Sequence, residues 1–280
     1  MKSFIFRNHR VLYLHKGQGP PLIMLHNGGN DHRIWDYQID FFKHYFEIFA
    51  LDLLGYGLSD KPDIEYTLNL YTQLLDHFIQ TNKLEQISLL GHCIGSATAL
   101  SYTLTHPETV RYLIMMNTAT MKTLLAGDLG KLYQWVQSSI VARQLLKILS
   151  VHLSLPGWVH QRCIQLQYGL ESELDALFMN HLIKRYQDPA QLSALYQLLL
   201  NFKSFSSLDT IEKPKAFPPT FIIWGGQNNI LPVKGGRVFA EHFKPDRFQI
   251  FTQGGHMVMR DCSRWVNQSL FNFFNDFKRV

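Results

Sequence analysis

The chain has 280 residues, of which 46% are hydrophobic and 18% charged, and its formal net charge is +5. This composition is typical of a globular protein and excludes a mostly disordered one. The Lys and Arg residues are scattered without a basic run, so the positive charge does not indicate a nucleic-acid-binding protein.

The first part of the chain predicts strands that alternate with helices. Short apolar runs bounded by turn residues are typical of buried strands, whereas apolar residues at helical spacing are typical of helices. The predicted strands cover residues 11–15, 21–25, 48–51, 87–90 and 110–116, and the predicted helices cover residues 35–46, 68–82 and 97–102. This alternation indicates an α/β fold with a mostly parallel, doubly wound sheet flanked by helices.

The alternation stops between residues 118 and 208. The stretches 132–149, 174–186 and 191–202 carry apolar residues at helical spacing, which predicts a helical insertion over a sheet edge. Strands at 218–226 and 248–251 and helices at 238–243 and 263–277 then resume the pattern. We therefore expect a core made of residues 1–117 and 209–280, with residues 118–208 as a helical lid.

The cysteines and the N-terminus indicate a reducing compartment. Cys93, Cys163 and Cys262 are odd in number and widely spaced, which predicts neither a disulfide framework nor a zinc site. The N-terminal apolar stretch is too short for a signal peptide, and no uncharged run has the roughly 18 residues of a membrane-spanning helix. The predicted location is cytoplasmic, without stable membrane insertion, and neither a metal nor a cofactor is expected.

Residues 91–95, Gly-His-Cys-Ile-Gly, have the spacing of a G-x-S-x-G nucleophile elbow with cysteine in place of serine. An apolar run precedes them and a helix-compatible segment follows, which is the strand, sharp turn and helix that an elbow requires. The glycines leave room for the strand and helix to pass closely. The pattern predicts Cys93 as a nucleophile, with a small buried residue as the alternative.

Four further motifs follow the order found in the α/β-hydrolase superfamily, which the chain resembles along nearly its whole length. His26-Asn27-Gly28-Gly29 resembles an oxyanion loop, and residues 52–60 resemble a D-x-x-G-x-G-x-S loop. Residues 224–228 match a W-G-x-x-D acid loop except at their last position. Gly254-Gly255-His256 resembles the loop that carries the catalytic histidine.

The resemblance implies a role for each matching position. Cys93 would be the nucleophile, His256 the general acid and base, and Asn228 the residue that orients the imidazole. The backbone N–H of Ile94 and that of Gly28 or Asn27 would form the oxyanion hole.

The residue that orients the histidine stays open. Asn229 could serve if the loop is shifted by one position, and Asn117 follows a strand where some superfamily members carry an alternative acid. Asn228 is the favoured choice. Asp52 and Asp60 are other candidate carboxylates, but their loop resembles a structural one.

Cysteine for serine and asparagine for aspartate are consistent with one mechanism. A serine triad loses turnover on the order of ten-thousand-fold when its aspartate becomes asparagine. A Cys-His pair can instead rest as thiolate and imidazolium, so the histidine needs orientation more than charge. We therefore expect a Cys-His-Asn set with a resting ion pair.

The predicted activity is hydrolysis of an ester, thioester or lactone through an acyl-cysteine, or acyl transfer or cyclisation with a non-water acceptor. The substrate would be a small acyl compound, which a carrier protein or coenzyme A could present. Lid residues such as Trp135 and Trp158 favour pocket walls or helix packing, and Lys131, Arg143 and Lys147 leave open a contact with a membrane or an acidic carrier. The alternatives are a degenerate hydrolase that only binds small molecules, and C–C cleavage or lyase chemistry.

Overall fold

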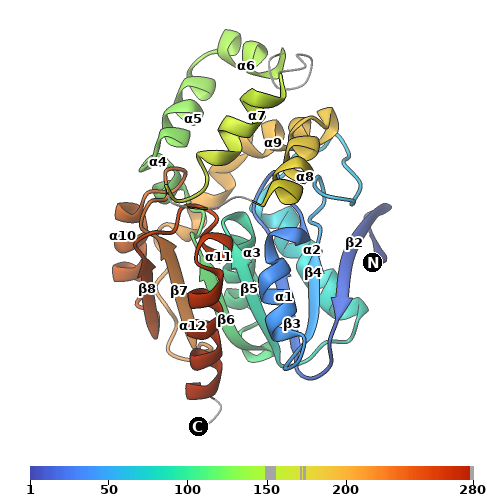
Figure 1. Cartoon of the computed structure of the whole chain (residues 1–280), viewed down its shortest axis with the longest axis vertical. Helices are drawn as coiled ribbons and strands as arrows, with labels where there is room; N and C mark the ends of the chain where they lie inside the picture. The colour runs from blue at the N-terminus through green and yellow to red at the C-terminus, as the bar shows by residue number, and fades with distance from the viewer. Residues whose placement is uncertain (149–155, 171, 173–174, 278–280) are drawn as a thin grey trace.

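An eight-stranded sheet forms the centre of the molecule (Figure 1). The computed structural model describes residues 1–148, 156–170, 172 and 175–277. The strand order is β1-β2-β4-β3-β5-β6-β7-β8, in which β1, β2 and β4 pair antiparallel and all other neighbours pair parallel. The strands are β1 (Lys2–Phe6), β2 (His9–Lys16), β3 (Pro21–Leu25), β4 (Glu47–Leu51), β5 (Ile87–His92), β6 (Val110–Met116), β7 (Thr220–Gly225) and β8 (Arg247–Phe251). The predicted α/β fold is confirmed.

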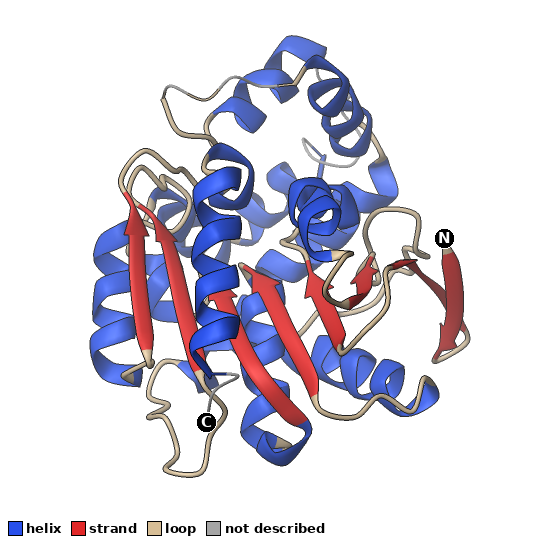
Figure 2. Ribbon diagram, turned by 60° about the horizontal axis from the view of Figure 1, so that its bottom comes forward, coloured by secondary structure: helices blue, strands red, loops and turns tan. Residues whose placement is uncertain are grey.

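Helices cover both faces of the sheet (Figure 2). One apolar core packs α2 (Leu68–Thr81), α3 (Ile94–Thr105) and α10 (Val233–Phe243) on one face, and a second packs α1 (Asp36–Phe42), α11 (Val258–Asp261) and α12 (Ser263–Asp276) on the other. Every residue of β5 and β7 is buried as a result. This explains why the central strands read as continuous apolar runs rather than alternating ones.

Two local predictions near the N-terminus differ from the structure. The edge strand β1 was not predicted, and its exposed Ile5 interrupts the apolar alternation that marks a half-buried strand. The helix predicted over residues 35–46 is a 3-10 turn, η1 (His32–Trp35), followed by α1, which ends at Phe42. Phe46 lies beyond that end but packs on Phe274 of α12, so its burial imitates a helical pattern.

The predicted lid, hereafter the cap segment (residues 118–208), stands over the C-terminal ends of the parallel strands (Figure 1). Its described elements are α4 (Met121–Leu125), α5 (Asp128–Ser138), α6 (Ile140–Lys147), α7 (Gly157–Gln165), α8 (Ala176–Tyr186), α9 (Pro189–Leu200) and the 3-10 helix η4 (Phe202–Leu208).

The single helical stretch predicted over residues 132–149 is broken into α5 and α6. The side chain of Ser139 accepts a hydrogen bond from the Ala142 N–H and caps the start of α6. Residues 149 and 174, which end and begin two of the predicted stretches, lie outside the described residues. None of the described helices is both long and apolar enough to cross a membrane.

Candidate active site

The predicted elbow is a strand, a one-residue turn and a helix. Cys93 follows β5 with φ 55° and ψ −113°, and α3 begins at Ile94. A Cβ on Gly95 would lie 2.2 Å from the Leu25 carbonyl oxygen, and one on Gly91 would lie 2.5 Å from the Gly95 carbonyl carbon. Glycine is required at both positions because the backbones approach so closely. The positive φ of Cys93 is strained for a residue with a side chain, and such strain concentrates at functional sites.

Two backbone N–H groups act on the Cys93 thiol. Those of Ile94 and Gly28 lower its pKa, against the larger effect of burial. One comes from the first turn of α3 and the other from the loop after β3, as the resemblance implied. Asn27 lines the same cavity, and its side-chain oxygen Oδ1 is buried without a hydrogen-bond partner.

The loop between β8 and α11 carries His256, and its backbone is held from two sides. The His256 carbonyl accepts hydrogen bonds from Asn117 Nδ2 at 2.8 Å and from His92 Nε2 at 2.7 Å. The imidazole is buried and lines the cavity with Cys93, and its Nδ1 has no hydrogen-bond partner. The contact from His92 joins positions 164 residues apart and holds the loop by a hydrogen bond.

The three candidate orienting residues occupy different environments. The Oδ1 of Asn228 accepts the N–H groups of Ile230 at 3.0 Å and Leu231 at 2.9 Å, so it organises its own loop, and its Nδ2 is buried without a partner. Asn229 is exposed. Asn117 bonds the backbone of His256 rather than its ring. The predicted hydrogen bond from Asn228 to the imidazole is therefore not formed in this structure.

Burial keeps both central groups neutral. Desolvation raises the pKa of the Cys93 thiol to about 12, although the Ile94 and Gly28 N–H groups act in the opposite direction. Desolvation also lowers the pKa of His256 to about 3, because no carboxylate or other acceptor compensates the imidazolium. Both shifts favour a thiol and a neutral imidazole over the expected thiolate and imidazolium.

The cavity in front of Cys93 has a volume of about 210 Å³ and a mostly apolar wall. The cap segment supplies much of that wall through leucines of α5 and α9, among them Leu129 and Leu198. Its polar contribution is Tyr186 of α8, whose hydroxyl accepts a hydrogen bond from Gln167 Nε2 at 3.0 Å. The sequence did not identify Tyr186 or Gln167, because no motif marks them.

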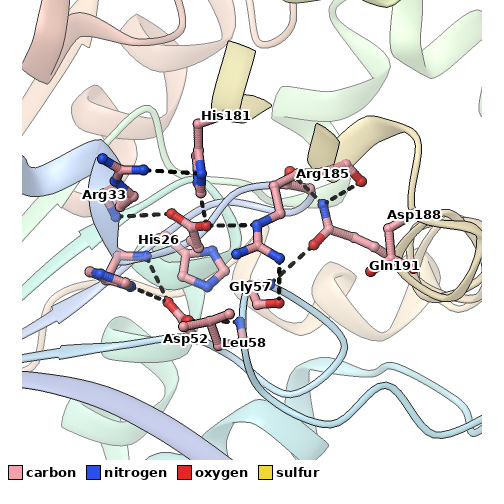
Figure 3. Close-up of polar contacts among 12 residues, drawn as sticks. His26, Arg33, Asp52, Gly57, Leu58, His181, Arg185, Asp188 and Gln191 are labelled. Carbon is pink, nitrogen blue, oxygen red and sulfur yellow. Dashed lines mark hydrogen bonds and ion pairs between the residues drawn. The ribbon is translucent and has the colours of Figure 1, made fainter. Parts of the chain in front are cut away.

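A polar network joins α8 to the core loop behind the cavity (Figure 3). Asp31 Oδ2 lies 2.6 Å from His181 Nε2 and 3.1 Å from Arg185 Nε. Arg185 also donates to the Gly57 carbonyl at 3.0 Å, and Gln191 of α9 donates to the Gly29 carbonyl at 3.0 Å. The pairing with His181 holds the pKa of Asp31 below its usual range despite burial. This network fixes the cap segment against the oxyanion loop.

Asp31, His32 and Asp52 offer possible metal-ligand atoms within 4.8 Å of one another, but these atoms already have partners. Asp52 Oδ1 accepts from the His32 backbone N–H at 2.8 Å and Oδ2 from that of Leu58 at 2.9 Å. His32 Nδ1 contacts Asp52 Oδ1 at 2.7 Å. The carboxylates thus hold loops together, as the sequence predicted for Asp52.

Comparisons with known proteins agree with this architecture. A profile described as the alpha/beta hydrolase fold matches residues 20–261. The 2-hydroxy-6-oxo-6-(2'-aminophenyl)hexa-2,4-dienoic acid hydrolase of Metapseudomonas resinovorans is 31% identical, over 88% of this chain and 81% of its own. The 2-hydroxymuconate semialdehyde hydrolase of Pseudomonas sp. (strain CF600) is 24% identical, over 86% and 81%.

Among solved structures, an alpha/beta hydrolase fold protein from Burkholderia ambifaria superposes with a TM-score of 0.80 at 20% identity and covers 97% of each chain. The relatives named above are hydrolases, which supports a hydrolase here as well. The profile match spans far more than half of the sequence. The chain therefore belongs to the α/β-hydrolase family.

Proposed function

We propose that the protein hydrolyses a neutral ester, thioester or lactone through an acyl-Cys93 intermediate. One observation carries the proposal: Cys93 sits on a strained turn and lines the same cavity as His256, Ile94 and Gly28. Strained backbone of this kind concentrates at functional sites, which supports a catalytic role for Cys93.

The neutral thiol and imidazole imply a general-base step. The imidazole of His256 takes the thiol proton as the sulfur attacks the carbonyl carbon, and the N–H groups of Ile94 and Gly28 receive the developing oxyanion. Collapse of the tetrahedral species expels the leaving group, which takes the proton from His256. Water then attacks the thioester with His256 as base, and the acid product and free thiol are released.

The cavity lining favours an uncharged substrate. The described residues around it include no Lys or Arg, and the lowered pKa of His256 keeps the imidazole uncharged. An ionised carboxylate buried there would lack a compensating charge, which is costly. The Metapseudomonas relative is named for a dienoic acid, so its substrate class fits this lining poorly.

C–C bond hydrolysis is the second candidate, because both relatives named above are hydrolases of the 2-hydroxy-oxo-dienoate or muconate semialdehyde type by name. It would require a neutral ketone substrate in this cavity. Acyl transfer to an alcohol or amine would use the same acyl-cysteine.

Intact-mass spectrometry after brief exposure to p-nitrophenyl acetate and a short acyl thioester tests the proposal. The wild-type protein should gain one acyl group that Cys93→Ala loses. Cys163→Ala is the matched control, because Cys163 is an exposed thiol that could react without a site. It should keep the adduct and the hydrolytic turnover.

Labelling that disappears in Cys163→Ala and persists in Cys93→Ala would disprove the acyl-Cys93 intermediate. Turnover of a neutral vinylogous diketone without any adduct would favour C–C hydrolysis. Saturable ligand binding with neither adduct nor turnover would favour a degenerate binding protein. Addition of an amine that shifts the product from acid to amide would identify an acyltransferase.

A further inference from the structure

The outward face of α6 in the cap segment carries four exposed apolar side chains, together with the polar Gln144. Ile140 and Val141 are each 76% exposed, and Leu145 and Ile148 are exposed as well. Val141, Leu145 and Ile148 share one side at helical spacing and Ile140 lies at its margin, whereas the side chain of Ala142 is buried. A surface helix of a globular domain normally has the reverse arrangement, with its apolar stripe inward and its polar face in water.

The cap segment has a further exposed apolar residue, Trp158, on α7. Its side chain is 71% exposed, which is unusual for so large an apolar group. Figure 1 places α6 at one end of the long axis of the molecule with α7 beside it, away from the sheet. Ile140, Val141, Leu145, Ile148 and Trp158 are together called the cap tip.

The stretch of chain that carries the cap tip is basic, although Lys131 at its start pairs with Asp128. Between residues 129 and 170 the sequence has no Asp or Glu, although the whole chain has 22 of them. The Lys and Arg residues of this stretch are Lys131, Arg143, Lys147 and Arg162. Lys147 is exposed at the edge of the α6 apolar face. An apolar face flanked by basic side chains is the arrangement of surfaces that lie on anionic membranes.

We propose that the cap tip docks on an anionic lipid bilayer, with Trp158 and the α6 face at the headgroup boundary. Tryptophan is favoured at that boundary because its ring is apolar and its N–H is polar. Pairing of two cap tips in a symmetric dimer would bring the same basic residues together and cause repulsion. Docking is peripheral, since no described helix can cross a membrane.

Co-sedimentation of the full chain with phosphatidylcholine vesicles, with and without about one third phosphatidylglycerol, tests the proposal. The test variant is Val141→Ser/Trp158→Ser. The matched control is Val238→Ser/Trp265→Ser, which removes a valine that is 58% exposed and a tryptophan that is 64% exposed from α10 and α12 of the core. Size-exclusion chromatography and turnover of a water-soluble ester are measured in parallel.

Wild-type protein should bind the anionic vesicles and bind the neutral ones far less. The test variant should bind at least about tenfold more weakly, because membrane affinity scales with buried apolar area, whereas the control should bind like wild type. Turnover of the soluble ester should be equal in all three.

Absence of wild-type binding to anionic vesicles would overturn the proposal, as would an equal loss in the test and control variants. A wild-type dimer that becomes monomeric in the test variant, without vesicle binding, would instead assign the cap tip to contacts between copies of this chain.

Discussion

At the scale of single residues, the site combines a well-formed turn at Cys93 with a histidine, His256, whose ring Nδ1 has no hydrogen-bond partner. No residue other than glycine fits at position 91 or 95, because a Cβ at either position would collide with backbone atoms. The turn therefore holds residue 93 beside the N–H groups of Ile94 and Gly28, whichever side chain that residue has. His256, by contrast, has its backbone anchored and its ring Nδ1 unpaired. Turnover should therefore be limited by formation of the imidazolium rather than by the oxyanion hole.

Asn228→Asp is predicted to raise the rate of Cys93 acylation by about tenfold or more, because a carboxylate stabilises the imidazolium as it forms. One carboxylate oxygen can still accept the N–H groups of Ile230 and Leu231, and the other replaces the Nδ2 that is buried without a partner. The measurement is the pre-steady-state release of p-nitrophenol.

Asn229→Asp is the control, because it adds the same charge at an exposed neighbouring position. It should leave the rate nearly unchanged. An equal gain in both variants would mean that net charge, not the buried position of residue 228, controls the histidine.

The sequence could predict the elbow, the oxyanion loop and the histidine loop because each depends on local spacing and on glycines that tolerate close contact. It could not predict the bonds of Asn228. An Asn side chain competes for nearby backbone N–H groups, and here Ile230 and Leu231 take its oxygen. Nor could it predict the pKa values of Cys93 and His256, which depend on burial contributed by the distant cap segment.

At the scale of elements, the position of α8 over the cavity depends on one buried carboxylate. Asp31 is 1% exposed, and its carboxylate pairs with both His181 and Arg185 of that helix. These partners are about 150 positions away along the chain. No short-range pattern could reveal this contact, although the helical character of the segment was predictable from its apolar spacing.

Asp31→Asn is predicted to destabilise the docking of α8 by about 3 kcal/mol, because it removes one partner of a buried ion pair and leaves the Arg185 charge uncompensated. The amide can still accept the Arg33 N–H that begins η1. Hydrogen exchange of the α8 amides, Ala176–Tyr186, should accelerate.

The matched control is Asp128→Asn, which breaks the exposed pair with Lys131 on α5. Exposed pairs contribute roughly 0 to 1 kcal/mol, so exchange in α8 should not change. Unaltered α8 protection in Asp31→Asn would show that apolar packing alone holds the helix.

At the scale of the whole molecule, the site lies where the two apolar cores meet the cap segment at the C-terminal ends of the strands (Figure 1). His26, His92 and His256 are all completely buried there, and burial lowers the pKa of each. Their bonds are made in the neutral form: His26 Nε2 accepts the Leu53 N–H at 2.8 Å, and its Nδ1 contacts the Asn27 carbonyl at 2.6 Å. In the folded protein these histidines therefore bind fewer protons than they do in the unfolded chain.

This difference predicts that the molecule loses stability as the pH falls from 7 to 5. A histidine whose folded pKa lies below its unfolded value of about 6.5 binds protons preferentially in the unfolded chain, so the free energy of unfolding falls with decreasing pH. His256 should contribute about 2 kcal/mol of loss over this interval, and His92 a loss of the same sign. Burial lowers the pKa of His32, but Asp52 outweighs this effect and the pKa is raised. His32 therefore partly offsets the loss near pH 7 and no longer does so well below pH 6.5, where it is protonated in both states. Urea unfolding followed by circular dichroism at pH 7, 6 and 5 measures how the free energy of unfolding depends on pH. His92→Gln should reduce that dependence by the contribution of one titrating histidine. A free energy of unfolding that stays constant or rises toward pH 5 would mean that these imidazoles are not held neutral in the folded protein.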